Sequence, residues 1–309
     1  MPDMKEKWVE IVLTTPLEIS DALANFLEEL GTNGVFQEES PDDFSGTSSV
    51  KNDQIIKAYL PAGRGTKEKL NRLQKYIDSL NEIFPKRRKP AFTTHRIVDP
   101  NWGEEWKKYF KPLRISKNII IKPTWERYTP TGRDIVIDID PGMAFGTGQH
   151  PSTEMCITAL EDIFQKDRSF QKWDVLDVGT GTGILAICAV KLGADHVTAI
   201  DIDPKAIEIT GINAAINEVQ DKIDVENRDI ALCTGSYNII TANLTSSTLI
   251  TIHAHLMPML AAGGYLIASG IIEQDKDTIE KLFQEKDVVI HEIRQQEEWV
   301  CYVFKKELP

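Results

Sequence analysis

The apolar positions in the first part of the chain follow two periods in turn. Residues 8–15 alternate between apolar and polar and are rich in β-formers, which predicts a strand. Over residues 19–30 the apolar positions recur at helical spacing until Gly31 ends the run, and a second stripe of this kind covers residues 70–84. Three short strand candidates complete this part, at 34–39, 54–60 and 91–98. This order of elements predicts an α+β, ferredoxin-like domain.

From residue 118 onward, strand patterns alternate with helical ones. Helices are predicted at 152–164, 184–192, 204–217, 247–260 and 276–284, and strands at 119–122, 135–139, 174–178, 197–201, 223–226, 238–242, 265–268, 288–294 and 299–304. Such alternation predicts an α/β, doubly wound, mostly parallel sheet that binds ligands at the carboxyl ends of its strands. The last two strands have no helix between them, which predicts an antiparallel edge.

The change of pattern indicates two domains. We expect a ferredoxin-like domain over residues 1–98, a linker over 99–117 and the α/β domain over 118–309. The linker begins with the aromatic and charged segment DPNWGEEWKKYFKP. Because ferredoxin-like domains often bind other macromolecules, the first domain is expected to recognise the substrate.

Composition narrows the class of protein. The net charge of −12 argues against direct, non-specific binding of DNA, which requires a basic surface. We also expect a cytoplasmic protein without a membrane association, because the sequence has neither a long apolar run nor a signal-like start. Its four cysteines form no CxxC pair, and His253 and His255 are spaced too closely to share a helix face, so no metal site is expected.

The strongest chemical signal is the segment 177–183, DVGTGTG, which follows an apolar strand and opens a helix. Glycines such as Gly179 and Gly181 allow a tight turn and the close approach of a ligand to N–H groups at the helix start. Asp201 ends the next strand, where its carboxylate can accept hydrogen bonds from both hydroxyls of a ribose. Asp177, beside the loop, is a candidate for holding a ligand amino group. A cofactor pocket is therefore predicted, with a purely structural turn as the alternative.

Two cofactors fit these features, S-adenosylmethionine and a nicotinamide dinucleotide. The glycines are spaced GxGxG, whereas a dinucleotide-binding turn usually has GxGxxG and places pyrophosphate at the helix start. S-adenosylmethionine has no phosphate, so a nearby acid is tolerated. The spacing favours a methyltransferase over a nicotinamide-dependent oxidoreductase.

Two further segments are expected to line the pocket. Residues 141–153, PGMAFGTGQHPST, connect a strand to a helix, with Phe145 available to pack on an aromatic ring and Thr153 in the first helical turn. His150 is interpreted mainly as a residue that fixes the shape of this loop. Asn243 follows the strand 238–242 but lacks the two prolines and the aromatic residue common in enzymes that methylate planar nitrogens. A tetrahedral amine is therefore the expected acceptor, although a strand-end asparagine can also be purely structural.

Together, PGMAFGTGQHPST, DVGTGTGILAI, AIDIDPKAI and ITANL closely resemble the ribosomal protein L-eleven methyltransferases, the PrmA family. The resemblance extends through the linker and the ASGII segment, over residues 99–272. It implies a class I methyltransferase fold and S-adenosylmethionine as the cofactor. The implied partner is ribosomal protein L-eleven, methylated on lysine side chains and its N-terminal amine. We also expect the enzyme to be a monomer.

The resemblance also assigns roles to individual residues. It implies that Thr153, Gly179, Asp201 and Asn243 contact the cofactor, and we add Gly181 and Phe145 from the two loops. Asn243 is also the candidate for orienting the acceptor amine. The chain departs from the family pattern at Ser152, at Leu244 and at the Thr245 that follows it. A non-catalytic adaptor that keeps the methyltransferase fold is an alternative of a different class.

Overall fold

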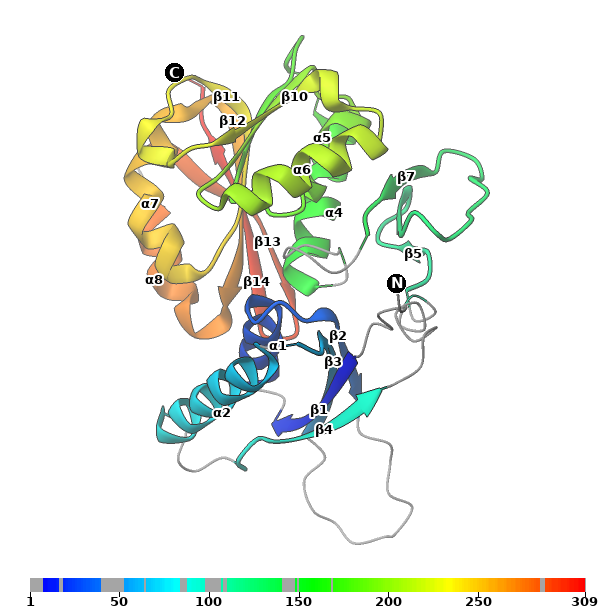
Figure 1. Ribbon diagram of the computed structural model, residues 1–309. Coiled ribbons are helices and arrows are strands. Elements are labelled where there is room, and N and C mark those ends of the chain that lie inside the picture. Colours follow the sequence, from blue (N-terminus) through cyan, green and yellow to red (C-terminus); the bar gives the residue numbers. More distant parts are fainter. Residues whose placement is uncertain are drawn as a thin grey trace, which may run out of the picture. The chain divides into compact units, whose positions relative to one another are not determined.

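The structure is a computed structural model of the 309-residue chain, and it describes residues 8–16, 19–39, 53–63, 65–83, 88–97, 107, 110–140, 148, 150–167, 169–283 and 287–308. The chain divides into two compact units (Figure 1). The first lies within Met1–Phe110, and the second includes Lys111–Asp140 and Gly146–Pro309. In the described parts, no helix has both the length and the apolar character needed to span a bilayer.

The first unit is a four-stranded antiparallel sheet with two helices. Its elements in chain order are β1 (Trp8–Pro16), α1 (Ser20–Glu29), β2 (Asn33–Glu39), β3 (Asp53–Pro61), α2 (Thr66–Ile83) and β4 (Ala91–Ile97). The strands lie in the order β2-β3-β1-β4, with every pair antiparallel. Alternate residues such as Ile11 and Leu13 on β1 are buried with the apolar stripes of both helices. The predicted ferredoxin-like arrangement is confirmed.

The second unit is built on a seven-stranded sheet. Its strands are β8 (Asp174–Val178), β9 (His196–Asp201), β10 (Ile223–Asn227), β11 (Tyr237–Asn243), β12 (Leu260–Ile272), β13 (Val288–Gln296) and β14 (Trp299–Lys306). They lie in the order β10-β9-β8-β11-β12-β14-β13. The first five are parallel to one another, and β14 is antiparallel to both of its neighbours. The predicted doubly wound sheet with an antiparallel edge is therefore confirmed.

Helices cover both faces of this sheet. They are α4 (Pro151–Lys166), α5 (Ile184–Leu192), α6 (Pro204–Ile216), α7 (Ser246–Met259) and α8 (Lys276–Phe283). Successive strand residues face opposite sides, so Val175 is buried with α4 and α5 while Leu176 is buried with α7 and α8. These two apolar layers hold the carboxyl ends of β8, β9 and β11 at one edge of the sheet.

One part of the second unit differs from expectation. The strands predicted at 119–122 and 135–139 form, but they do not join the large sheet. As β6 (Ile119–Lys122) and β7 (Ile135–Asp138) they pair with each other and with β5 (Leu113–Arg114) in a separate three-stranded sheet. The physical reason is packing, because their buried isoleucines lie in the apolar cluster formed with α4 and α5. A local β pattern does not specify which sheet a strand will join.

Candidate functional site

The turn between β8 and α5 has the glycine-dependent shape predicted from its sequence. The N–H groups of Gly179 and Thr180 both donate to the carbonyl oxygen of Ile200, at 2.9 and 3.0 Å, which folds the turn onto the end of β9. Gly179, Gly181 and Gly183 have φ values of 71°, 57° and 80°. A Cβ at Gly179 would also lie 2.4 Å from Cδ2 of Leu244. The backbone conformation therefore favours glycine, and a larger residue would in addition require the Leu244 side chain to move.

Asp201 lies next to this turn, at the end of β9. One of its carboxylate oxygens, Oδ2, accepts a hydrogen bond from the N–H of Gly181 at 3.1 Å. The other, Oδ1, accepts from the N–H of Asp203 at 2.9 Å, and Asp203 in turn caps the N-terminus of α6. The side chain is only half-buried, so it has room to accept further hydrogen bonds. The structure thus brings the predicted residues Gly179, Gly181 and Asp201 together.

Asn243 and Thr153 meet at the end of β11. Asn243 Nδ2 donates to Thr153 Oγ1 at 3.1 Å, and Thr153 lies buried in the first turn of α4. Asn243 Oδ1 is buried and accepts no hydrogen bond from the described residues. Leaving a buried acceptor unsatisfied costs about 1–3 kcal/mol, so this oxygen is suited to a donor from a ligand. Thr245, one of the departures from the family pattern, caps the N-terminus of α7.

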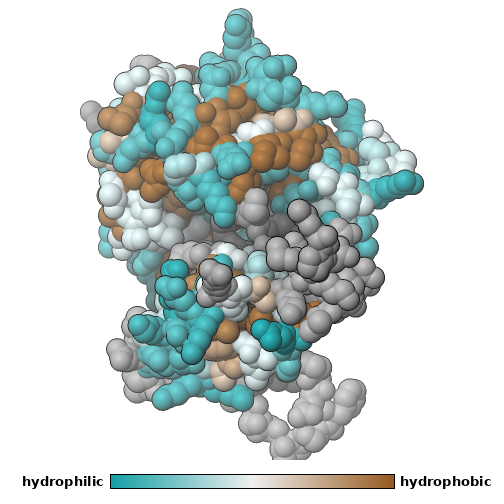
Figure 2. Space-filling view, in the orientation of Figure 1, coloured by the Kyte–Doolittle hydropathy of each residue, from teal (hydrophilic) through white to brown (hydrophobic). Residues whose placement is uncertain are grey.

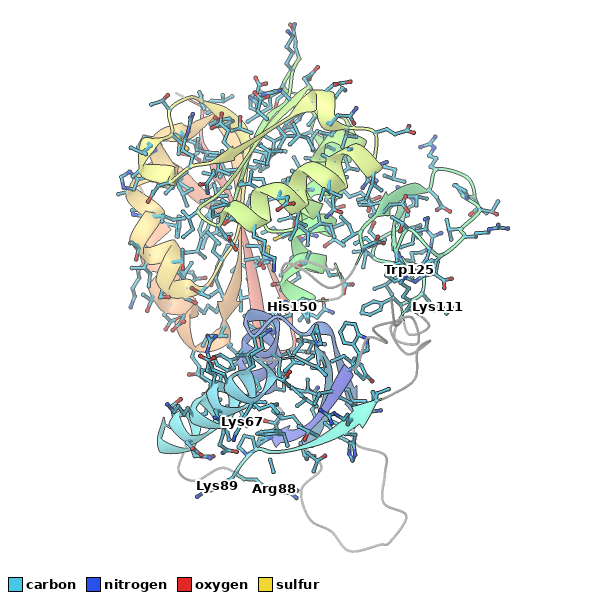
Figure 3. The ribbon with its side chains drawn as sticks, viewed as in Figure 1. Lys67, Arg88, Lys89, Lys111, Trp125 and His150 are labelled. Atoms are coloured by element: carbon cyan, nitrogen blue, oxygen red, sulfur yellow. The ribbon has the colours of Figure 1, made fainter. Side chains whose placement is uncertain are left out.

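The start of α4 is fixed by His150 (labelled in Figure 3). Its Nδ1 accepts a hydrogen bond from the N–H of Ser152 at 3.2 Å and lies 2.7 Å from the Ser152 hydroxyl oxygen. The imidazole packs edge-on against Trp299, with the ring centroids 4.7 Å apart. Ser269 Oγ donates to the carbonyl oxygen of Ser152 at 3.0 Å. These contacts agree with the interpretation of His150 as a residue that shapes the loop.

Phe145, also predicted to contact the cofactor, lies outside the described residues. The same holds for the rest of the 141–147 segment. A metal site was not expected from the sequence, and the described residues contain no cluster of side chains able to hold a metal ion.

Asp177 differs from its expected role beside a ligand amino group. The side chain is 1% exposed, and its two oxygens accept hydrogen bonds from Thr241 Oγ1 at 2.6 Å and Thr180 Oγ1 at 2.7 Å. Burial raises the pKa of this carboxyl, and the two threonine hydroxyls oppose that shift. Asp177 therefore faces the interior, where it ties the glycine turn to β11.

Sequence reasoning also missed three buried polar residues of the second unit. They are Thr210, Asn213 and Asn217, on α6 and at its C-terminal cap. Their spacing of three and four residues places them on one helix face, which is the signal that could have identified them. Thr210, Asn213 and Asp177 form hydrogen bonds with residues of the glycine turn. Asn217 instead holds the end of β7.

Comparison with known proteins connects this geometry to a family. The family model described as ribosomal protein L11 methyltransferase (PrmA) matches residues 7–307. A protein of that name from Pelobacter propionicus is 35% identical over 305 residues, which cover 98% of this chain and 99% of the relative. Another from Bacillus velezensis is 37% identical, over 97% of this chain and 100% of the relative.

A solved structure agrees with the sequence relatives. The crystal structure of a ribosomal protein L11 methylase from Lactobacillus delbrueckii subsp. bulgaricus is 30% identical and superimposes with a TM-score of 0.58. The match covers 64% of this chain and 100% of that one. The second unit has the class I methyltransferase fold, and the chain belongs to the ribosomal protein L11 methyltransferase (PrmA) family.

Proposed function

We propose that this protein transfers methyl groups from S-adenosylmethionine to amino groups of ribosomal protein L11. The observation that carries the proposal is the corner where the glycine turn meets Asp201 and where Asn243 meets Thr153, at the carboxyl ends of neighbouring parallel strands. Membership of the family over nearly the whole chain supports the same activity. The GxGxG spacing and the family together favour it over an oxidoreductase.

The residues at this corner fit the cofactor. The turn at Gly179 and Gly181 has no side chain to obstruct a ligand, and Asp201 would accept hydrogen bonds from the ribose hydroxyls. The buried, unsatisfied Oδ1 of Asn243 can accept a hydrogen bond from an ammonium or amine group. Thr153 would hold Asn243 in the required rotamer through the 3.1 Å hydrogen bond. Phe145 is proposed to pack on the adenine ring.

The chemistry requires a neutral amine close to a sulfonium methyl group. When bound, S-adenosylmethionine supplies an electrophilic methyl group for in-line displacement. A lysine with a reference pKa near 10.4 must lose its proton first, which costs about 4.6 kcal/mol at pH 7. We propose that a dry pocket lowers the amine pKa, that Asn243 orients the lone pair, and that water removes the proton. Asp177 is not a candidate base, because its carboxylate is enclosed by two threonine hydroxyls.

The first unit is proposed to recruit the protein substrate. It has its own apolar core, independent of the two cores of the second unit, and the family match includes it. We further propose that lysine side chains and the N-terminal amine of ribosomal protein L11 are the acceptors. Since that substrate is a ribosomal component, we expect the enzyme to act in the cytoplasm. We also propose that it acts as a monomer.

A methylation assay tests this function directly. The full chain is incubated with isotope-labelled methyl donor and purified ribosomal protein L11, and the product is analysed by peptide mass spectrometry. Label is expected on lysine side chains and on the N-terminal residue, and not in a reaction that lacks the enzyme. Tight binding of the methyl donor without any transfer to this protein would instead support the adaptor. Fluorescence showing that reduced nicotinamide cofactor binds would support the oxidoreductase.

A further inference from the structure

Helix α6 and its C-terminal cap bury three polar side chains beside apolar ones, and the helix leaves two isoleucines exposed. Thr210, Asn213 and Asn217 are 0%, 4% and 5% exposed, whereas Ile212 is 51% exposed and Ile216 is 39% exposed. Figure 2 shows apolar surface on the second unit over the region where α6 lies in Figure 1. Buried polar groups require hydrogen bonds to offset the loss of hydration, and exposed isoleucines forgo apolar burial. The burial of three polar groups on one side of this helix indicates that they have a specific task.

Two of them hold the backbone of the glycine turn. Thr210 Oγ1 donates to the carbonyl oxygen of Gly181 at 3.0 Å, and Asn213 Nδ2 donates to that of Thr182 at 2.8 Å. In a trans peptide the C=O and the N–H point in opposite directions. Fixing these two carbonyl groups on α6 therefore turns the next N–H groups, those of Thr182 and Gly183, away from α6. Hydrogen bonds from α6 thus determine the orientation of the turn.

The third residue holds a different segment. Asn217 donates from Nδ2 to the carbonyl oxygen of Asp138 at 2.7 Å, and its Oδ1 accepts from the N–H of the same residue at 2.9 Å. Asp138 is the last residue of β7, just before the 141–153 loop that leads to Thr153. One helix, with its C-terminal cap, therefore holds the backbone of the glycine turn and of the end of β7.

We infer that Thr210, Asn213 and Asn217 are positioning residues for the methyl donor. They act through the backbone of Gly181, Thr182 and Asp138, which they keep in the conformation that binds the ligand. The inference rests on the proposed function, because it assigns the methyl donor to the glycine turn. It adds that the affinity for this ligand depends on hydroxyl and amide groups on α6, behind the turn.

A pair of variants at Thr210 separates positioning from packing. Thr210→Val removes the hydroxyl and keeps the shape of the side chain, whereas Thr210→Ser keeps the hydroxyl and removes a methyl group. Ile279→Val serves as the stability control, because Ile279 is fully buried on α8 in the other apolar cluster of this unit. A general loss of stability would affect all three variants, whereas loss of the hydrogen bond affects only Thr210→Val.

The readout is the affinity of the full-length protein for S-adenosylhomocysteine, measured by calorimetry. We expect the Kd to rise about fivefold in Thr210→Val, within the range for the loss of one neutral hydrogen bond. Thr210→Ser and Ile279→Val should bind like the wild type. In the protein without ligand, hydrogen exchange of the amides of residues 179–183 should also become faster in Thr210→Val and remain unchanged in the other two variants.

Four results would contradict the inference. Wild-type affinity in Thr210→Val would show that the hydroxyl does not position the turn, and equal weakening in Ile279→Val would show a general effect of stability. Unchanged amide exchange at residues 179–183 in Thr210→Val would overturn the inference and leave the proposed function intact. If the wild type itself did not bind S-adenosylhomocysteine, the proposed function would fail and this inference with it. Should Thr210→Val not fold, Asn217→Ala at the C-terminal end of α6 tests the same claim, with a raised Kd expected.

Discussion

Replacing Gly270 by alanine should destabilise the second unit and disturb the site through the backbone. Gly270 lies in β12 with a φ of 81°, where the pairing of β12 with β14 shifts register between Ala268 and Ile271. A Cβ at this position would lie 2.5 Å from the carbonyl oxygen of Leu244 and 2.9 Å from its carbonyl carbon. Because these are backbone atoms, they cannot rotate out of the way. The strand end that carries Asn243 has to shift instead.

The expected cost has two parts. A positive φ costs an alanine about 1 kcal/mol, and overpacking at a close contact adds roughly 1–3 kcal/mol. A total near 3 kcal/mol should lower the melting temperature by roughly 6–12 °C for a unit of this size. Gly132→Ala is the matched control, because Gly132 has a φ of 61° and a Cβ there would meet nothing within 4 Å. It should lower the melting temperature by only roughly 2–4 °C.

Thermal unfolding of the full-length variants, followed by circular dichroism, gives the two melting temperatures. Calorimetry with S-adenosylhomocysteine then shows whether the shift reaches Asn243, and we expect weaker binding in Gly270→Ala alone. Equal losses of stability in both variants would refute the steric reasoning. A strongly destabilised Gly270→Ala that binds the ligand normally would refute the coupling through Leu244.

Three further predictions concern the cofactor, the acid limit of stability and the two units. Asp201→Ala should weaken cofactor binding by roughly one to two orders of magnitude, because charge-assisted hydrogen bonds contribute about 1.5–3 kcal/mol; unchanged affinity by calorimetry would refute this assignment. Burial raises the pKa of Asp167, but hydrogen bonds from Ser169 and Tyr265 and the charge of Lys305 outweigh burial and lower the pKa from 3.8 to about 2. A lowered folded pKa provides stability that is present above the unfolded pKa and is lost as the pH falls toward 2. In urea unfolding, the free energy of unfolding should therefore fall less between about pH 4 and 2 in Asp167→Asn than in the wild type. An identical fall in the two proteins would contradict this. A fragment of residues 111–309 should bind the cofactor normally but fail to methylate ribosomal protein L11, and full activity of that fragment would exclude the recruiting role of the first unit.

Local patterns in the sequence identified most of the fold. Ile184–Leu192 begins after a glycine and is apolar nearly throughout, and it forms the predicted helix with the predicted bounds. The strand predicted at 265–268 is much longer, because β12 already begins at Leu260. Gly263 and Gly264 resemble a turn in the sequence, but they lie in an irregular part of β12, between its pairings with Tyr237 and Ile239 on β11. The length of this strand therefore depends on pairing between distant segments, which local propensity does not predict.

The same distinction holds for the candidate site. Gly179, Asp201 and Asn243 could be predicted as neighbouring site candidates because a glycine turn and the polar ends of parallel strands have a local signature. The inward orientation of Asp177 depends on Thr241, which is distant in the sequence and reaches it only through the pairing of β8 with β11. A carboxylate next to a glycine turn has the same local sequence whether it faces a ligand or the core.

Crystals of the full-length protein grown with S-adenosylhomocysteine test the central claim most directly. The account predicts electron density for the ligand against the turn at Gly179 and Gly181, with both ribose hydroxyls within hydrogen-bonding distance of the Asp201 carboxylate. Ligand density at another place in the molecule, with this turn left vacant, would contradict the account.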